Sequence, residues 1–108
     1  MSPDLEQPLR IVASRDGDTA TFTLAGELDP HTAPMLADEL DDAIGAGATT
    51  VALQLADLTF IDSSGLRVVI SAHRRLDEDG GRLVLRSPSD TVRRLLEITG
   101  LLDHIDIE

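Results

Sequence analysis

The chain has 108 residues, 42% of them hydrophobic and 27% charged, which fits one small soluble domain and leaves no room for a second. Its 20 acidic residues outnumber nine basic ones, all of them Arg, so the formal net charge is −11 and binding to a nucleic-acid backbone is disfavoured. The absence of cysteine excludes disulfides, cysteine zinc sites and thiol catalysis.

The N-terminal segment 1–8 is acidic, contains two prolines and lacks an apolar stretch, so we expect a disordered lead-in and no signal peptide. No apolar run reaches the about 18 residues that a membrane span requires, which favours a cytoplasmic protein without membrane attachment. Residues 9–108 then form a single domain. Most of the acid excess, a net −10, lies in residues 1–62. Such charge usually keeps a surface soluble, and a part in partner recognition is the alternative.

The first predicted strands form a hairpin. Residues 9–14 and 19–25 both alternate apolar and polar side chains, which is the pattern of half-buried strands. Between them, Arg15–Asp18 has turn composition, and Gly17 can adopt a positive φ. We therefore expect two antiparallel neighbours at the start of the sheet.

A helix is predicted to begin near Thr32, because Pro34 suits a first turn and apolar residues then recur at helical spacing. These apolar residues are Leu36, Leu40, Ala43 and Ile44, and Gly45 and Gly47 mark the end of the helix. Four acids fall on the opposite face, namely Asp38, Glu39, Asp41 and Asp42. A solvated surface is a better interpretation of them than a metal cluster.

The middle of the chain has the order strand, helix, strand. Residues 51–55 predict an apolar central strand, residues 82–86 predict the next one, and the helix between them starts after the segment 62–66. Its predicted inward stripe is Leu66, Val69, Ile70, His73 and Leu76. A third helix follows, with Ser89 as N-cap, Val92, Leu95, Leu96 and Thr99 inside and Gly100 just past its end.

Residues 104–108 add a short edge strand. Together these elements predict an α/β fold, a mixed sheet of four to five strands with helices packed mainly on one face. In open sheets of this kind, binding sites tend to lie beyond the carboxyl ends of the central strands. The segment 60–66 lies at such an end and carries two serines at the start of a helix.

Three roles compete for Ser63 and Ser64. One of them can cap the following helix, which serine does very commonly. Either can be a nucleophile, but His73 lies about 15 Å further along the helix, and only His31 could serve as base if the fold brings it across. The Gly-x-Ser-x-Gly pattern of a nucleophile elbow is also absent, which disfavours hydrolysis. Third, phosphorylation would add about −1.5 to −2 charge and could switch off a complex.

Several short motifs occur in a specific order along the chain. They are Gly26-Glu27-Leu28-Asp29, Thr32-Ala33-Pro34, Asp57-Leu58, Asp62-Ser63-Ser64-Gly65-Leu66, Leu95-Leu96 and Thr99-Gly100-Leu101. Their order and spacing closely resemble the STAS domains of the anti-sigma factor antagonist family, over residues 9–107. Within that family, the sequence most resembles the single-domain antagonists that regulate sporulation and stress responses.

The resemblance implies a partner-switching regulator and not an enzyme. In that family the unphosphorylated antagonist binds an anti-sigma factor, which is also a GHKL-type serine kinase, and so frees a sigma factor. The kinase phosphorylates the first serine after the motif aspartate, here Ser63, and the antagonist is released. A metal-dependent serine phosphatase restores it. ATP and magnesium belong to the kinase, so no cofactor is expected for this chain, and we expect a monomer or weak dimer.

The family positions also imply a partner-binding surface. Asp29 matches an acidic position near the acceptor, Asp62 precedes the acceptor, and Arg67 lies on the following helix. The full expected set is Asp29, His31, Thr32, Asp62, Ser64, Gly65, Leu66 and Arg67. For Asp29 the alternative is a turn role before Pro30, for Gly65 a packing role, and for Arg67 a solvated face.

Two other functions are weighed against this one. A STAS scaffold of a signalling complex, or the small subunit of a lipid-transporter ATPase, would share the fold without a sigma partner; such relatives often carry threonine at the acceptor position, so Ser63 favours the antagonist. A nucleotide-binding or hydrolytic protein would need a glycine-rich phosphate loop, which the sequence lacks.

His73 and His104 have no metal-ligand spacing. Relatives often continue into a further C-terminal helix, and a chain that stops at residues 105–108 would leave part of the sheet or the second helix less covered.

Overall fold

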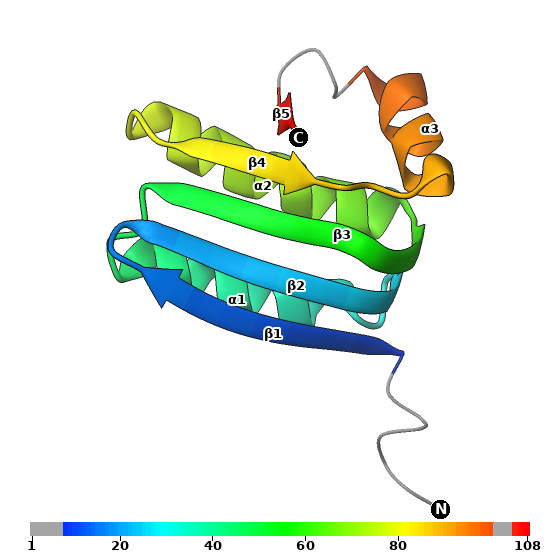
Figure 1. Ribbon diagram of the computed structural model, residues 1–108, viewed down its shortest axis with the longest axis horizontal. Helices are drawn as coiled ribbons and strands as arrows, with labels where there is room; N and C mark the ends of the chain where they lie inside the picture. Colours follow the sequence, from blue (N-terminus) through cyan, green and yellow to red (C-terminus); the bar gives the residue numbers. More distant parts are fainter. Residues whose placement is uncertain (1–7, 101–104) are drawn as a thin grey trace, which may run out of the picture.

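The computed structural model describes residues 8–100 and 105–108, and these form one mixed five-stranded sheet with three helices (Figure 1). The elements in chain order are β1 (Leu9–Asp16), β2 (Thr19–Leu28), α1 (Ala33–Gly45), β3 (Thr50–Ile61), α2 (Ser63–Glu78), β4 (Arg82–Arg86), α3 (Asp90–Thr99) and β5 (Asp106–Ile107). The strand order is β1-β2-β3-β4-β5, with only β1 and β2 antiparallel. The predicted α/β class and mixed sheet are confirmed.

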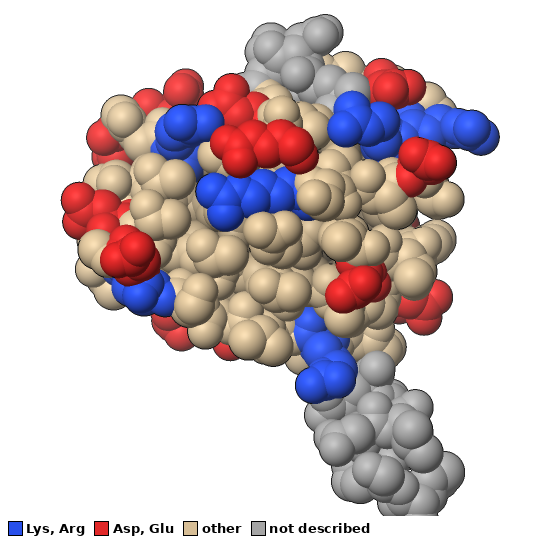
Figure 2. Space-filling model, viewed as in Figure 1, with Lys and Arg blue, Asp and Glu red and all other residues tan. Residues whose placement is uncertain are grey.

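One face of the sheet carries the core. Figure 1 shows α1 and α2 side by side behind the strands, while α3 stands beyond the end of β4. The core joins the inner face of the strands to the two helices, through fully buried leucines such as Leu24, Leu53, Leu36 and Leu76. The other face is open over β1, where Val12 remains 59% exposed. Figure 2 shows this open face largely uncharged over β1 to β3, with acids and arginines around its margins. The helices therefore pack mainly on one face, as predicted.

The hairpin of β1 and β2 forms as predicted, with a tighter turn. Strand pairing continues to Asp16 and Thr19, so only Gly17 and Asp18 are left to turn the chain, and Gly17 adopts φ +59°. The expected four-residue turn over 15–18 is shorter because the antiparallel ladder continues through its first two residues.

Strand β3 is the largest departure from the sequence prediction. It runs from Thr50 to Ile61, whereas apolar residues indicated only 51–55. The additional segment alternates poorly, because Ala56, Asp57 and Phe60 are all exposed. It is nevertheless extended, because backbone pairing with β2 continues to the end of that strand through two register shifts. Backbone hydrogen bonds of this kind do not depend on the side-chain pattern. As a result, β3 leads almost directly into α2.

The two later helices confirm most of their predicted faces. In α2 the buried residues are Gly65, Leu66, Val69, Ala72 and Leu76, whereas Ile70 and His73 are only half-buried. In α3 the hydroxyl of Ser89 accepts from the Val92 N–H at 3.3 Å, and Gly100 closes the helix at φ +76°. The prediction for Thr99 is wrong, because its side chain is exposed and its hydroxyl donates to the carbonyl of Leu96 at 2.8 Å. A hydroxyl satisfied by its own helix needs no place in the core.

The chain ends in a short strand at the edge of the sheet. β5 pairs in parallel with β4 inside the predicted segment 104–108, and two ion pairs join the strands, Arg82 with Asp106 at 2.8 Å and Arg86 with Glu108 at 3.1 Å. Among the helices of residues 8–100 and 105–108, none is long and apolar enough to cross a membrane. His104 and the predicted lead-in, apart from Pro8, lie outside the described residues.

Candidate functional site

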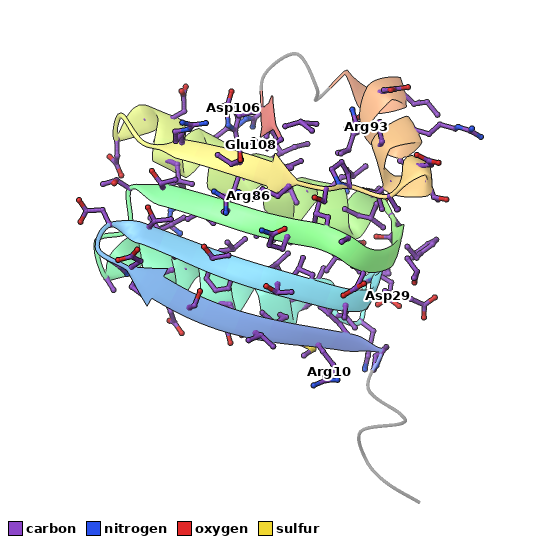
Figure 3. The ribbon with its side chains drawn as sticks, viewed as in Figure 1. Arg10, Asp29, Arg86, Arg93, Asp106 and Glu108 are labelled. Atoms are coloured by element: carbon purple, nitrogen blue, oxygen red, sulfur yellow. The ribbon has the colours of Figure 1, made fainter. Side chains whose placement is uncertain are left out.

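The carboxyl ends of β2 and β3 bring the sequence-predicted site residues together. Leu28 at the end of β2 is paired with Ile61 at the end of β3, and the Asp62 N–H donates to the carbonyl of Leu28 at 3.2 Å. Because the two strands are parallel, the segments that follow them emerge at the same edge of the sheet. The loop of Asp29 and the start of α2 at Ser63 are therefore neighbours, at the end of β2 where Figure 3 labels Asp29.

Asp62 caps helix α2, so the capping role considered for Ser63 and Ser64 is filled by their neighbour. Its backbone is extended (φ −116°, ψ −170°), and its Oδ1 accepts from the Ser64 N–H at 2.9 Å and the Gly65 N–H at 3.1 Å. A carboxylate satisfies these donors and also interacts favourably with the helix dipole. Within the described part of the chain, the Ser63 hydroxyl makes no hydrogen bond. It lies exposed at the first position of the helix.

The loop after β2 is held by a compact set of hydrogen bonds between Asp29 and Thr32. The Asp29 Oδ1 accepts from the N–H groups of His31 at 2.9 Å and Thr32 at 3.0 Å. The Thr32 hydroxyl accepts from the Asp29 N–H at 2.9 Å and donates to the carbonyl of Glu27 at 2.9 Å. Thr32 is completely buried. The turn role considered for Asp29 is therefore present in the structure.

These hydrogen bonds lower the pKa of Asp29 below its ordinary value of 3.8. The Thr32 N–H is the largest cause; partial desolvation opposes it, and the His31 N–H, the Thr32 hydroxyl and the nearby His31 ring add to the lowering. The folded-state pKa is thus depressed, so the loop contributes stability above pH 3.8 and loses it as the pH falls through the folded value. In a carbon-13 NMR titration we expect the Asp29 carboxyl midpoint below 3.8. A midpoint at or above this value would contradict the hydrogen-bonded loop.

Gly65 sits where α2 presses against the ends of both central strands. A Cβ at this position would lie 2.7 Å from the Leu28 side chain and 2.9 Å from that of Ile61. Both neighbours are buried, so they have little room to move. The packing role considered for Gly65 is present in the structure.

Replacing Gly65 with alanine is expected to destabilise the fold. Overpacking costs about 1–3 kcal/mol, while alanine in place of glycine in a helix returns about 0.5–1, so a net loss of about 1–2 kcal/mol should appear in urea unfolding. Gly45→Ala is the matched control, because no atom lies within 4 Å of the added Cβ in α1. We expect that variant to be neutral or slightly more stable, and equal effects for the two variants would argue against the packing role.

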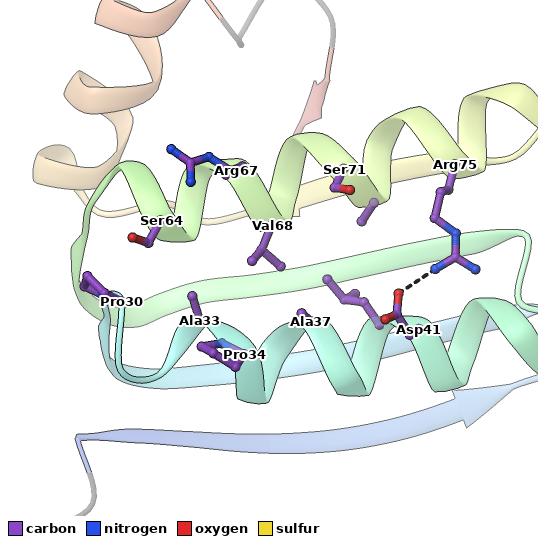
Figure 4. Close-up of a pocket in the computed structure, with 12 residues that line it drawn as sticks. Pro30, Ala33, Pro34, Ala37, Asp41, Ser64, Arg67, Val68, Ser71 and Arg75 are labelled. Atoms are coloured by element: carbon purple, nitrogen blue, oxygen red, sulfur yellow. Dashed lines mark hydrogen bonds and ion pairs between the residues drawn. The ribbon is translucent and has the colours of Figure 1, made fainter.

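A groove of about 500 Å³ runs between α1 and α2 and opens beside the start of α2, where Ser64 and Arg67 line it. Figure 4 shows Ser64 and Arg67 at one end and the ion pair of Arg75 with Asp41 at the other. The floor and walls are mainly apolar, with Pro30, Ala33, Pro34, Ala37, Leu40, Val68 and Ala72. The groove was not predicted from the sequence. The sequence shows only that both helices carry small apolar residues, and whether these residues face each other depends on how the helices pack.

In the part of the chain that it describes, the structure does not place a histidine base in hydrogen-bond contact with Ser63 or Ser64, as a hydrolytic site would require. His31 is exposed on the loop after β2, and no hydrogen bond among the described residues joins a histidine ring to Ser63 or Ser64. His73 is half-buried further along α2. In residues 8–100 and 105–108, no group of three or more His, Cys, Asp or Glu could hold a metal ion.

The predicted partner-binding residues fall into two layers. His31 and Arg67 are exposed, and Asp29, Asp62 and Ser64 are partly exposed around Ser63. Thr32, Gly65 and Leu66 are buried and support that surface from beneath. The role of Asp62 as cap was missed, although an aspartate directly before a helix start is itself a cap signal.

Comparison with known proteins identifies the family. The chain matches the STAS domain over residues 10–108. It is 35% identical over 97 residues to the anti-sigma-B factor antagonist of Listeria monocytogenes, covering 90% of this chain and 85% of that protein. The solved structure of the anti-sigma factor antagonist SpoIIAA in its unphosphorylated form has a TM-score of 0.81 at 32% identity, covering 92% of this chain and 88% of that one.

The Bacillus cell fate determinant SpoIIAA in its phosphorylated form is similar as well. Its TM-score is 0.75 at 31% identity, with coverage of 92% of this chain and 91% of that one. These matches extend over nearly the whole sheet and all three helices. The chain belongs to the STAS domain family and, within it, to the anti-sigma factor antagonists.

Proposed function

We propose that the protein is a phosphorylation-controlled partner switch with Ser63 as its acceptor. The unphosphorylated form binds an anti-sigma factor that is also a GHKL-type serine kinase, and the sigma factor is released. The kinase transfers the γ-phosphoryl group of ATP to the Ser63 Oγ, which loses its proton, and ADP is the other product. The phosphorylated protein dissociates, and a metal-dependent serine phosphatase removes the phosphate.

The observation that carries this proposal is the free, exposed hydroxyl of Ser63 at the first position of α2. Because Asp62 already caps the helix, Ser63 is not needed to hold the turn together. A kinase can therefore modify it without unfolding the helix start. The names of the similar proteins favour this function over a STAS scaffold or transporter subunit without a sigma partner.

The docking surface in this proposal surrounds Ser63. Asp29, His31, Asp62, Ser64 and Arg67 would contact the kinase, and Thr32, Gly65 and Leu66 would support them. A phosphate here adds about −1.5 to −2 charge beside two carboxylates, Asp29 and Asp62. At an interface formed with the neutral serine, that charge is both unpaired and like-charged with its neighbours, which lowers affinity strongly.

The remaining properties follow from this role. The protein acts by binding, performs no catalysis of its own and works in the cytoplasm, where its partners are. ATP and magnesium are bound by the kinase, so the domain over residues 9–108 functions without a cofactor, as a monomer or weak dimer. The N-terminal segment 1–8 is a lead-in to that domain.

Mapping the phosphate tests the proposal directly. The protein is incubated with its cognate anti-sigma kinase and ATP, and the modified residue is identified by mass spectrometry. Wild type and Ser64→Ala should be phosphorylated, whereas Ser63→Ala should lose nearly all incorporation. Ser64→Ala removes the other hydroxyl of the same turn, so phosphorylation that persists in this variant and is lost in Ser63→Ala assigns the phosphate to Ser63. Full phosphorylation of Ser63→Ala would refute the assignment of the acceptor.

A further inference from the structure

Arg67 lies one helical turn after Ser63 on α2. Residues four apart on a helix are neighbours on one face, with Cβ atoms about 5–6 Å apart. Helical side chains also lean toward the helix N-terminus, so the Arg67 side chain covers the turn that contains Ser63. Figure 4 shows the Arg67 guanidinium directed toward the start of α2. A group attached to the Ser63 Oγ is therefore within reach of that guanidinium.

The backbone at the start of α2 has few donors left for a phosphate. The N–H groups of Ser64 and Gly65 are taken by the Asp62 carboxylate, and the N–H of Leu66 donates to the Asp62 carbonyl at 3.0 Å. Only the N–H of Ser63 itself remains in this turn. Any further hydrogen bonds that the protein itself gives to the phosphate oxygens must come from side chains, in competition with water.

Arg67 is available for that role. Its side chain is exposed, and in the described part of the chain it takes part in none of the ion pairs, which occupy Arg75, Arg82 and Arg86. A guanidinium offers five N–H donors in a planar arrangement that matches two phosphate oxygens. The carboxylates of Asp29 and Asp62 repel the same phosphate, which increases the benefit of a nearby cation.

We infer that phosphoserine at position 63 is held by Arg67, through a charge-assisted pair within α2. The pair does two things at once. It offsets the repulsion from Asp29 and Asp62 and so stabilises the phosphorylated form. It also engages the Arg67 guanidinium, which in the unphosphorylated protein lines one end of the groove between α1 and α2 and is available to a partner.

The effect of this pair on partner binding rests on the proposed function, whereas the pair itself needs only a phosphate on Ser63. If Ser63 is the acceptor, phosphorylation removes a cation from the docking surface as well as adding an anion. The partner then loses an attractive contact and meets a repulsive one. Both effects lower affinity: the attractive contact is lost at Arg67, and the repulsive charge is added at Ser63.

The test uses protein in which phosphoserine is inserted at position 63 during translation, so that no kinase has to choose the site. Proton–nitrogen NMR spectra of the arginine Nε–Hε groups are compared for the Ser63 and phosphoserine forms, and Arg67 is assigned by the signal lost in Arg67→Gln. We expect the Arg67 signal to move downfield and to exchange more slowly with water in the phosphoserine form. The Arg74 signal, eleven residues from Ser63, should not change.

Thermal unfolding gives a second measurement. Phosphoserine should lower Tm by about 2 °C or more in Arg67→Gln relative to wild type, because the repulsion is no longer offset. Arg74→Gln is the matched control, since it removes the same charge from the same helix beyond reach of the phosphate. Unchanged Arg67 signals, or equal Tm shifts for the two variants, would overturn the inference. Because the phosphate is installed without a kinase, such a failure leaves the acceptor assignment untouched, and loss of the acceptor assignment leaves this result standing.

Discussion

Ser63→Asp should weaken binding to the anti-sigma kinase by at least tenfold and up to about a thousandfold, while the fold is retained. The aspartate places a fixed negative charge beside Asp62 and Asp29, as phosphorylation would. Each tenfold loss corresponds to about 1.4 kcal/mol, and a misplaced charge at an interface can cost several kcal/mol. At the first helical position an aspartate interacts favourably with the helix dipole, so thermal stability should stay equal or rise slightly.

The two effects of this substitution are measured separately. Isothermal titration calorimetry with the kinase gives the affinity, and thermal unfolding of the free protein gives the stability. Ser14→Asp is the matched control, because it adds the same charge to an exposed position of β1 on the open face of the sheet. Unchanged affinity for Ser63→Asp, with normal binding by the control, would remove the basis of a charge-controlled switch.

Thr32→Val should cause the largest loss of stability at the site, about 2–4 kcal/mol. Valine has nearly the same shape, but it cannot accept from the Asp29 N–H or donate to the Glu27 carbonyl, and both partners would be left unsatisfied around a fully buried side chain. Each buried polar group without a partner costs about 1–3 kcal/mol. For a domain of this size the loss corresponds to a decrease in Tm of about 10 °C or more.

Thr59→Val provides the comparison for this prediction. The Thr59 hydroxyl also donates to a backbone carbonyl, that of Gly26 at 3.0 Å, but its side chain is exposed and water can replace the bond. We expect a change of no more than about 0.5 kcal/mol in urea unfolding. A similar loss for both variants would show that the buried hydrogen bonds of Thr32 are not what stabilises the loop.

The hydrophobic pattern predicted the elements well where side chains alternate between core and solvent. The β1–β2 hairpin, the apolar start of β3, the strand β4 and the capped helix α3 all follow from periodicity and turn chemistry that act within a few residues. The second half of β3 did not follow, because its exposed residues 56, 57, 59 and 60 give no such pattern. Its extended backbone depends on the neighbouring strand, which is a tertiary contact.

At the site, too, some features followed from the local sequence and others depended on tertiary contacts. The family resemblance carried by the short motifs singled out Ser63 and its neighbours, because those motifs are runs of consecutive residues that can be recognised without the fold. They did not show whether Ser63 or Asp62 caps α2, since both residue types are good caps and the choice depends on backbone geometry. Once Asp62 takes the cap, the serine hydroxyl is free, and the interpretation of the whole turn changes.

Composition and motif order by themselves determined that this is a small acidic α/β protein of the antagonist family, because hydrophobic periodicity and short motifs are local properties of the chain. The tertiary structure alone decided which predicted site residues reach the surface. It buried Thr32, Gly65 and Leu66 under the turn and left Ser63 and Arg67 exposed on it. It also opened the groove between α1 and α2. These properties arise when the ends of β2 and β3 pair and two helices pack side by side, and those contacts join residues far apart in the sequence.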